Sequence, residues 1–288
     1  MDYVIITDVT CDLGQDLIDK YNLVVMPMKY SVGDKEYVNY ADFREQPLEE
    51  FYKEMSEGKM THTVQLNSEV YKETYRKYLA EGKDVFGVIF SSGLSGSYNS
   101  ARIAVDELKS EFPERKIYIC DTLAASTGEG FIALMAAINR DNGMSIDENF
   151  VKIEEIKLHV AHWFTVSNLE YLRRGGRVSN TAAYAAKVLN IKPVLHVDND
   201  GHLIAVSKKI GRKNSIKEIV KQYIETCDFS YDTVVISHAC CIEDANYLKE
   251  LVLEVSKPKN IIVSNIGTVI GSHSGPGTLA LYFIASHR

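Results

Sequence analysis

The chain of 288 residues lacks the marks of several large classes of protein. Its 32 lysines and arginines are outnumbered by 39 aspartates and glutamates, whereas nucleic-acid binders usually carry a basic excess. No apolar run approaches the roughly 18 residues that a membrane span needs. The first residues, MDYVIITD, have no basic segment of the kind that opens a secretory signal. We therefore expect a soluble, cytoplasmic protein with no nucleic-acid partner and no stable membrane insertion.

Cysteine is scarce and scattered. None of the five cysteines forms a C-x-x-C pair, and the adjacent Cys240 and Cys241 are poorly placed to bridge each other. We expect reduced thiols and no metal site. G-x-G-x-x-G and P-loop motifs are also missing, so no cofactor is implied. In GLSGS (93–97) the second glycine comes one residue too early for the G-x-S-x-G motif of serine hydrolases.

Strand and helix patterns alternate through roughly the first 150 residues. Apolar, β-branched runs predict strands at 3–8, 23–32, 85–90 and 116–120. Pro27 indicates an edge or irregular position for the second of these strands, and the polar stretch 33–47 is typical of a loop. Helical spacing occurs at 13–21, 48–58, 68–80, 97–111 and 128–139. This alternation predicts a mainly parallel sheet built of βαβ units.

The second half has a different pattern. PVLHVDNDGHLIAVSKK (193–209) predicts a hairpin that turns at Asn199, Asp200 and Gly201. Other strands are expected at 159–166, 233–239 and 260–266, and helices at 180–189, 214–226, 244–255 and 277–286. A local hairpin among such elements indicates a mixed sheet. The fold class is therefore α/β, with two α/β domains at 1–150 and 151–288 and a boundary near 145–158.

The stretch SSGLSGS (91–97) stands between a predicted strand and a predicted helix. Ligands of open α/β sheets bind beyond the carboxyl ends of the strands. A helix amino terminus there offers free N–H groups to an anion. One serine would be enough to cap the helix, and four serines with two glycines exceed that need. We therefore expect this turn to bind an anion or a carboxylate.

Three other stretches carry polar side chains at predicted element ends. GTVIGSHSGPG (267–277) places His273 in a glycine-rich turn ahead of the predicted last helix, where a neutral, hydrogen-bond-donating imidazole is expected. In THTVQLNS (61–68), Thr63 and its polar neighbours either bind a ligand or precede a helix capped by Asn67 or Ser68. LEYLRRGGRVS (169–179) holds Arg173, Arg174 and Arg177, which either clamp an anion or form a solvated basic turn.

Two acids, Asp8 and Asp12, follow the first strand in TDVTCDL. Acids four residues apart can bind a metal, but this stretch has no histidine and no further acid nearby. We expect one of them to cap a helix and the other to make a local hydrogen bond.

Taken together, these stretches resemble the DegV family of bacterial proteins over essentially the whole chain. FSSGLSGSYNSA is the most specific stretch, GTVIGSHSGPG is nearly as specific, and LEYLRRGGRV supports both. TDVTCDL and THTVQLN are weaker matches. The order and spacing of all five stretches carry the resemblance more than any single one does.

The resemblance implies a fatty-acid-binding protein with a long acyl chain buried between or within its two domains. In this family a threonine, a serine and a histidine hold the carboxylate. Thr63 and His273 match two of these residues, and both Ser92 and Ser95 match the serine. Arg177 matches the arginine of the family's G-G-R motif. Members that act as carriers catalyse nothing alone, and present the fatty acid to a separate kinase that makes an acyl phosphate.

The chain departs from the family pattern in places. Val9 stands where the family usually has serine, and V-Q-L-N stands where it has S-Q-P-S. Ile210 lies near the position of an arginine in a surface implicated in meeting the kinase. Other positive charges flank it, at Lys208, Lys209, Arg212 and Lys213.

Two other functions remain open from the residues themselves. The first is a serine-dependent hydrolase or acyltransferase, in which Ser92 or Ser95 is the nucleophile, His273 the base, and Asp8 or Asp121 its orienting acid. The second is a phosphosugar or nucleotide binder, which the Gly-Ser turn favours and the missing phosphate-binding motifs disfavour.

Overall fold

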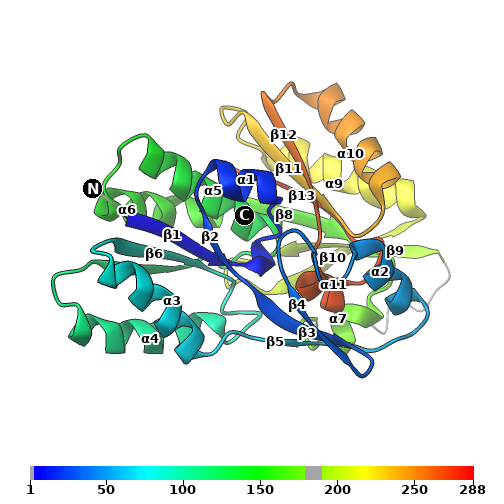
Figure 1. The fold of residues 1–288 in the computed structure, drawn as a ribbon. Helices are drawn as coiled ribbons and strands as arrows, with labels where there is room; N and C mark the ends of the chain where they lie inside the picture. The colour runs from blue at the N-terminus through cyan, green and yellow to red at the C-terminus, as the bar shows by residue number, and fades with distance from the viewer. Residues whose placement is uncertain (1–2, 179–189) are drawn as a thin grey trace.

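The computed structural model describes residues 3–178 and 190–288, and these form helices and three sheets (Figure 1). The predicted helix at 180–189 lies outside the described residues. Among the described helices, none combines the length and the apolar character that a membrane span requires.

The first sheet is parallel, as the βαβ pattern predicts. Its strands, in spatial order, are β2 (Val24–Met26), β1 (Tyr3–Asp8), β6 (Asp84–Ile89) and β7 (Ile117–Asp121). The short β2, which ends next to Pro27, is an edge strand. The helices that pack on this sheet are α3 (Ser68–Ala80), α4 (Ser97–Glu111), α5 (Thr127–Asp141) and α6 (Ile146–Ile156). In Figure 1, α3 and α4 cover one face, and α5 and α6 lie over the other.

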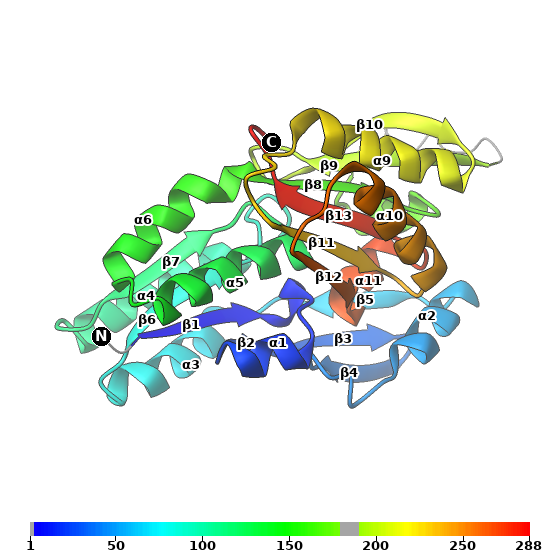
Figure 2. The ribbon, with the colours of Figure 1, turned by 90° about the horizontal axis from the view of Figure 1, so that it is seen from above.

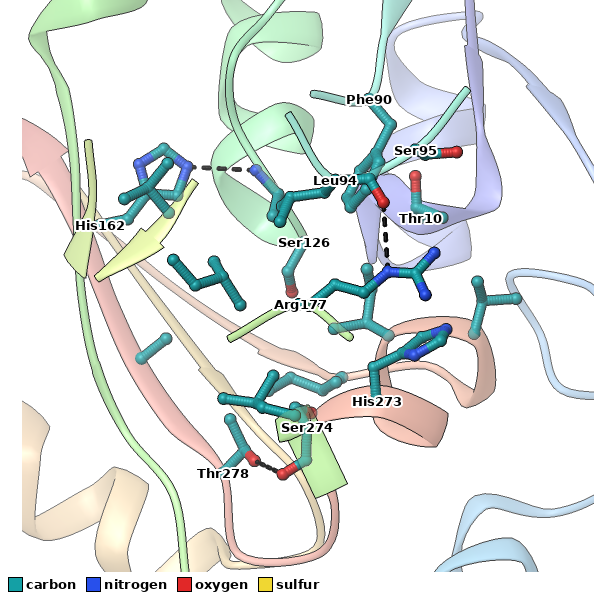
Figure 3. A pocket seen from close by; sticks show the side chains of 18 of the residues that line it. Thr10, Phe90, Leu94, Ser95, Ser126, His162, Arg177, His273, Ser274 and Thr278 are labelled. Atoms are coloured by element: carbon teal, nitrogen blue, oxygen red, sulfur yellow. Dashed lines mark hydrogen bonds between the residues drawn. The ribbon is translucent and has the colours of Figure 1, made fainter. Parts of the chain in front are cut away.

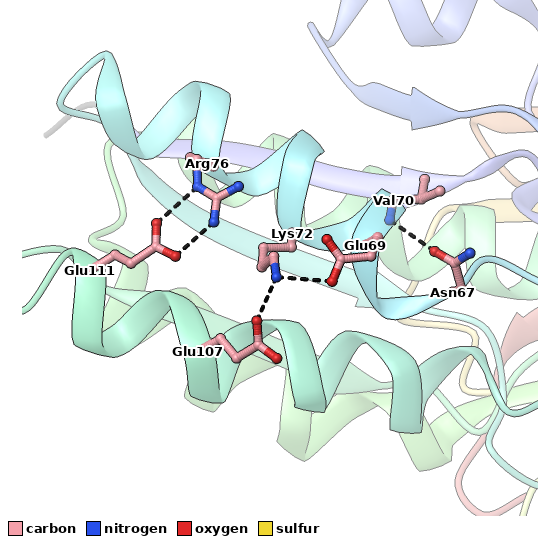
Figure 4. A network of polar contacts seen from close by, with 7 residues as sticks. All are labelled: Asn67, Glu69, Val70, Lys72, Arg76, Glu107 and Glu111. Atoms are coloured by element: carbon pink, nitrogen blue, oxygen red, sulfur yellow. Dashed lines mark hydrogen bonds and ion pairs between the residues drawn. The ribbon is translucent and has the colours of Figure 1, made fainter.

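Helix α3 shows why the helical spacing is a reliable predictor here. Tyr71, Tyr75 and Leu79 lie four residues apart, are all buried, and pack on β6 and α4. Lys72 and Arg76 flank this buried stripe and make ion pairs to Glu107 and Glu111 of the neighbouring α4 (Figure 4). Arg76 makes two hydrogen bonds to Glu111, of 2.9 and 2.7 Å. Exposed pairs of this kind contribute about 0–1 kcal/mol each, so the buried stripe is the main source of this packing.

The largest sheet is mixed and lies in the second half of the chain. Its strands, in spatial order, are β10 (Leu203–Ile210), β9 (Ile191–Val197), β8 (Val160–Thr165), β13 (Leu279–Ile284), β11 (Thr233–His238) and β12 (Asn260–Asn265). Strands β9 and β10 form the predicted hairpin, and only β11 and β12 pair in parallel. Figure 2 shows α9 (Arg212–Thr226) and α10 (Ile242–Val255) over one face of this sheet.

The prediction of a helix at 277–286 is wrong, because LALYFI forms β13. All six of its residues are buried, and the strand lies between β8 and β11 in the sheet. A strand that is buried on both faces has a continuous apolar run instead of an alternating one. Periodicity alone cannot distinguish such a run from a short buried helix.

The polar stretch 33–47 is also not wholly a loop. Residues 35–39 form β4 (Lys35–Asn39), which pairs with β3 (Met28–Val32) through a turn at Gly33, a residue with positive φ. β5 (Thr61–Val64) completes a three-stranded antiparallel sheet. Helices α2 (Leu48–Ser56) and α11 (Thr268–Ser274) pack on this small sheet, so segments from the two halves of the chain meet here.

The parallel and mixed sheets share one hydrophobic core. Helix α5 contacts β1 and β6 on one side and β8 and β11 on the other. The remaining short elements are η1 (Val9–Cys11), α1 (Gln15–Lys20), η2 (Lys157–His159) and α7 (Glu170–Arg174). The division into domains at 1–150 and 151–288 stays a prediction.

Candidate functional site

A cavity lies where the three sheets meet, and segments from both halves of the chain line it (Figure 3). Most of its wall is apolar. The apolar lining includes Met28, Phe90, Leu94, Phe164, Leu172, Val197, Leu203, Ile266, Val269, Ile270 and Ala280. The polar lining consists of Thr10, Thr63, Gln65, Ser95, Ser97, Ser126, His162, Arg177, His273, Ser274, Thr278 and Tyr282. An apolar cavity with a few convergent polar groups is the usual form of a small-molecule site.

The parallel sheet contributes to this cavity at its carboxyl edge. Thr10 follows β1, Ser95 follows β6, and Ser126 follows β7. The expectation that ligand-binding turns gather beyond the carboxyl ends of the strands therefore agrees with the position of the cavity. The same rule could have identified Thr10 and Ser126, which motif inspection missed.

The four serines of SSGLSGS have different surroundings. Ser91 is buried and donates to the Gly201 carbonyl at 2.9 Å, which ties β6 to the β9–β10 hairpin. Ser92 is exposed and does not line the cavity. Ser95 and Ser97 both line it, and their hydroxyl oxygens are 3.0 Å apart. The Ser95 hydroxyl also accepts the Ser97 N–H at 3.2 Å, so it belongs both to the cavity wall and to the start of α4.

His273 lies in the last turn of α11, and β13 follows after the Gly275–Gly277 turn. The expectation that it precedes a helix is wrong, so a helix amino terminus cannot explain a neutral imidazole. Burial, with smaller contributions from Arg177 and His62, lowers the pKa of His273 to about 4. The ring Nε2 lies 2.9 Å from the Thr63 hydroxyl. The buried Nδ1 has no hydrogen-bond partner among the described residues, which suits a group that a ligand satisfies.

The stretch THTVQLN connects the small sheet to the other polar groups. Thr63 in β5 contacts His273, and the Gln65 side chain accepts the Gly96 N–H at 3.1 Å. A Cβ on Gly96 would lie 2.8 Å from the Gln65 amide nitrogen, so this glycine permits the close approach. Asn67 caps α3 by accepting the Val70 N–H at 3.1 Å. The capping role predicted for this stretch is therefore confirmed at Asn67, and ligand binding by Thr63 stays a prediction.

Of the three arginines in LEYLRRGGRVS, Arg177 lines the cavity. Its Nε donates to the Leu94 carbonyl at 3.2 Å, and its Nη1 donates to the Gly175 carbonyl. Figure 3 shows the guanidinium between Leu94 and His273. Burial lowers the pKa of Arg177 below its ordinary value. Arg173 pairs with Glu170, and Arg174 lies over the Tyr171 ring, so neither forms a clamp with Arg177.

Buried acids lie directly behind this polar wall. The Thr10 hydroxyl contacts both Asp8 and Glu129, the latter at 2.8 Å, and Asp8 also accepts the Thr10 N–H at 2.9 Å. Burial raises the pKa of Asp8 and of Glu129, and their mutual repulsion raises that of Glu129 further. The expectation of helix capping fits Asp8, which caps η1. Asp12 instead bonds to Ser126 and Gly267, far away in the sequence, so the expectation of only local bonds for it is wrong.

His162 in β8 is a second histidine of the cavity wall, and sequence inspection missed it. It stands in the run HVAHWFTV, which carries no glycine or motif to mark it. Its Nε2 accepts the Ala125 N–H at 3.4 Å, and its Nδ1 lies 2.9 Å from the Val160 carbonyl. Burial and the positive charge of Arg288 lower its pKa well below the ordinary range.

The geometry does not favour a serine-hydrolase triad. Asp8 is bonded to Thr10, and the Asp121 carboxylate accepts the N–H groups of Ser92 and Leu123. Neither acid bonds to His273, whose Nδ1 has no partner among the described residues. A triad base needs an acid on its second nitrogen. The arrangement is therefore suited to holding a ligand more than to activating a serine.

Candidate metal ligands gather at the β9–β10 turn and are not part of the cavity lining. Among the described residues, Asp198, Asp200 and His202 place one ligand atom each within 4.8 Å of one another. Asp198 already accepts the N–H groups of Asp200 and His202, at 3.0 and 2.8 Å. This is the pattern of an aspartate that stabilises its own turn, so the turn itself accounts for the cluster.

Known proteins resemble this chain along its whole length. A DegV domain-containing protein of Clostridium perfringens is 38% identical over 290 residues, which cover 99% of this chain and 98% of that protein. The solved structure of a DegV lipid-binding protein from Thermotoga maritima matches with a TM-score of 0.86 and 30% identity, covering 100% of both chains. The structure of a fatty-acid-binding DegV-family protein from Thermus thermophilus matches with a TM-score of 0.87 and 29% identity, and the match covers 99% of this chain and 100% of that chain.

The family comparison agrees with these relatives and with the motif order. The protein-family model described as "Uncharacterised protein, DegV family" matches residues 2–286 of this chain. The three stretches that carry the resemblance most strongly each place a residue in the cavity, namely Ser95, Arg177 and His273. This chain therefore belongs to the DegV family.

Proposed function

We propose that this protein binds a long-chain fatty acid, with the acyl chain in the apolar part of the cavity and the carboxylate at Thr63, Ser95, Arg177 and His273. The observation that carries the proposal is the buried Nδ1 of His273, which has no hydrogen-bond partner in the part of the chain that the structure describes and lies in a largely apolar cavity. The lipid-binding relative from Thermotoga maritima and the fatty-acid-binding relative from Thermus thermophilus support it.

The energetics suit an amphiphilic ligand. Each buried methylene contributes about 0.8 kcal/mol, so about fourteen methylenes contribute roughly 11 kcal/mol before the costs of association are subtracted. The head group then needs orientation more than strong attraction. A neutral imidazole, a hydroxyl and a guanidinium already bonded to two carbonyls provide that without a tight ionic clamp.

The direct test is native mass spectrometry of protein purified without delipidation. The expected result is an added mass that matches a fatty acid, which solvent extraction removes and added fatty acid restores. A protein that purifies free of lipid and takes up no added fatty acid would contradict the proposal.

Covalent labelling with a fluorophosphonate, which reacts with activated serines, tests the hydrolase alternative. We expect no labelling of Ser92 or Ser95 under conditions that label a control hydrolase.

The finer part of the proposal is that the protein catalyses nothing alone and presents the carboxylate to a fatty acid kinase in the cytoplasm. The basic residues around Ile210 lie on the edge strand β10 and at the start of α9, and Ile210 itself is 72% exposed. Lys209 and Arg212 are already paired with Glu218 and Asp244. A kinase contact there would therefore rest mainly on Lys208 and Lys213.

A reconstituted assay tests this partner. Purified kinase, ATP and the fatty-acid-loaded protein should form acyl phosphate, and neither protein should do so without the other. The double variant K208E/K213E should lower the rate several-fold and leave fatty acid affinity unchanged. Acyl phosphate formation by this protein alone, or an undiminished rate with the variant, would contradict the corresponding part of the proposal.

A further inference from the structure

The helix that presents His273 is held at its amino terminus by residues from the other end of the chain. α11 has only seven residues, and its N-cap, Gly267, has no side chain to accept the first N–H groups. The first four N–H groups of a helix have no partners within that helix. In this helix, side chains more than 200 residues away in the sequence accept two of the N–H groups at and just after the cap.

Asp12 is the first of these residues. Its Oδ1 accepts the Gly267 N–H at 2.8 Å, and its Oδ2 accepts the Ser126 hydroxyl at 2.5 Å. Its own carbonyl accepts the Ser264 hydroxyl at 2.5 Å. A Cβ on Gly267 would lie 2.7 Å from Asp12 Oδ1, so the glycine allows this contact. One buried carboxyl thus joins the end of η1, the start of α5 and the start of α11.

Asn39, at the end of β4, is the second. Its side-chain oxygen accepts the Thr268 hydroxyl at 2.5 Å and the Val269 N–H at 3.2 Å. Its amide group donates to the Tyr40 carbonyl at 3.0 Å, which fixes the orientation of the side chain. Asn39 is 2% exposed, so water does not substitute readily for these bonds.

Residues of α2 and β5 also contact α11 and the residue before its cap. The Tyr52 hydroxyl donates to the Ile266 carbonyl at 2.7 Å, and a Cβ on Gly271 would lie 2.3 Å from that hydroxyl. At the other end of the helix, Thr61 donates to the Ser272 carbonyl at 3.2 Å, and Thr63 contacts His273. Since seven residues make only about two turns, a shift at the first turn moves the imidazole in the last turn.

We propose that Asp12 and Asn39 are positioning residues for His273: they cap α11 from outside and thereby set where the imidazole meets Thr63 and the cavity. They touch neither the imidazole nor the carboxylate position. A loss of fatty acid affinity on removing these caps rests on the proposed function, whereas a change in the position of the imidazole does not.

The test compares Asn39→Ala with Asn149→Ala. Asn149 is a matched control because it is a fully buried asparagine whose amide donates to Tyr3 and to the Ala136 carbonyl, both at 2.8 Å, in a part of the fold without α11. The readout is the NMR signal of the His273 ring in ligand-free protein, titrated with acid. Asn39→Ala should shift this signal and raise the pKa of His273 toward its ordinary value, and Asn149→Ala should do neither.

Asp12 supplies a second comparison. Asp12→Ala should act like Asn39→Ala, whereas Asp12→Asn should restore the wild-type His273 signal, because its amide oxygen still accepts the Gly267 N–H. Fatty acid affinity should fall about tenfold in both alanine variants and remain within about twofold in Asp12→Asn and Asn149→Ala.

The outcomes separate the two proposals. Unchanged His273 signals in both folded alanine variants would overturn the positioning role, whatever happens to their stability. If wild-type protein binds no fatty acid, the proposed function fails, while the His273 titration still decides the positioning role. Should Asp12→Ala not fold, the Asn39→Ala and Asp12→Asn comparison is sufficient.

Discussion

The cavity wall contains two histidines with the same charge state and very different surroundings. Burial keeps both His162 and His273 neutral. His162 has both ring nitrogens bonded to main-chain groups and packs edge-to-face on Tyr282, with ring centroids 5.2 Å apart. A Cβ on Gly128 would lie 2.0 Å from His162 Nε2, so the ring fills its space closely. His273 has one nitrogen bonded to Thr63 and the other without a partner among the described residues.

This difference separates a histidine that holds the fold from one that is able to hold a ligand. A lowered pKa occurs at both residues, so it does not distinguish them. The number of hydrogen bonds that the protein itself supplies does distinguish them, because an unsatisfied buried nitrogen costs free energy until a ligand bonds to it. The two histidines should therefore respond differently to substitution.

The largest effect is expected for His162→Ala. The substitution leaves a cavity, removes the acceptor of the Ala125 N–H and leaves the Val160 carbonyl with the Arg288 Nε–H as its side-chain donor. It should therefore lower the free energy of unfolding by about 3 kcal/mol. Urea denaturation of the ligand-free protein measures this. Fatty acid affinity of the folded variant should stay within about threefold of wild type. A stable variant with strongly weakened binding would reverse the roles assigned to the two histidines.

His273→Ala should have the opposite profile. Loss of a hydrogen bond to a charged carboxylate costs roughly 2 kcal/mol, or about a thirtyfold increase in the fatty acid Kd. The free energy of unfolding should change by less than about 1 kcal/mol, because Thr63 is the one hydrogen-bond partner of this imidazole among the described residues. Fluorescence competition gives the Kd, and the same urea series gives the stability.

A smaller effect concerns the pH dependence of stability. Between pH 6.5 and 5 the His273 imidazole stays neutral in the native protein, because its pKa is about 4, while in the unfolded chain it takes up a proton. The unfolded state then binds more protons, so this residue lowers stability as the pH falls. His273→Gln should therefore reduce the loss of stability between pH 6.5 and 5 by about 1.5 kcal/mol. Equal losses in the variant and wild type would show that His273 is already charged near pH 6.

The smallest effect distinguishes the two candidate serines. Ser95→Ala should raise the fatty acid Kd about three- to fivefold, in line with the loss of about 1 kcal/mol for a neutral hydrogen bond. Ser92→Ala is the matched control in the same turn, and it should change the Kd by less than about twofold because Ser92 is exposed and outside the cavity lining. A larger effect of Ser92→Ala would place the carboxylate on the other side of the turn.

Local patterns predicted most of the elements in the parallel sheet. Helix α4 starts and ends at the predicted residues 97 and 111, and the β9–β10 hairpin lies where its turn residues indicate. The errors occur where burial hides periodicity, as at β13, or where polar residues form a short exposed strand, as at β4. Both elements obtain their hydrogen bonds from strands elsewhere in the chain or across a turn, and composition does not show those partners.

The residues of the candidate site also divide into those that local motifs predict and those that only the folded chain distinguishes. The motifs identified Thr63, Ser95, Arg177 and His273, which the structure brings to one cavity from β5, the start of α4, the segment after α7, and α11. The motifs could not separate Ser95 from Ser92, because both are serines of one turn and only the direction of each side chain differs.

The sequence by itself determined the α/β class, the family, and the turns at which polar groups leave the strands. These follow from interactions between near neighbours, whose spacing is visible along the chain. Only the tertiary structure decided which serine faces the cavity and that Asp12 caps a helix 255 residues away. It also decided that both ring nitrogens of His162 have hydrogen-bond partners, whereas Nδ1 of His273 has none among residues 3–178 and 190–288. Those properties depend on hydrogen-bond partners that become neighbours only after the chain has folded.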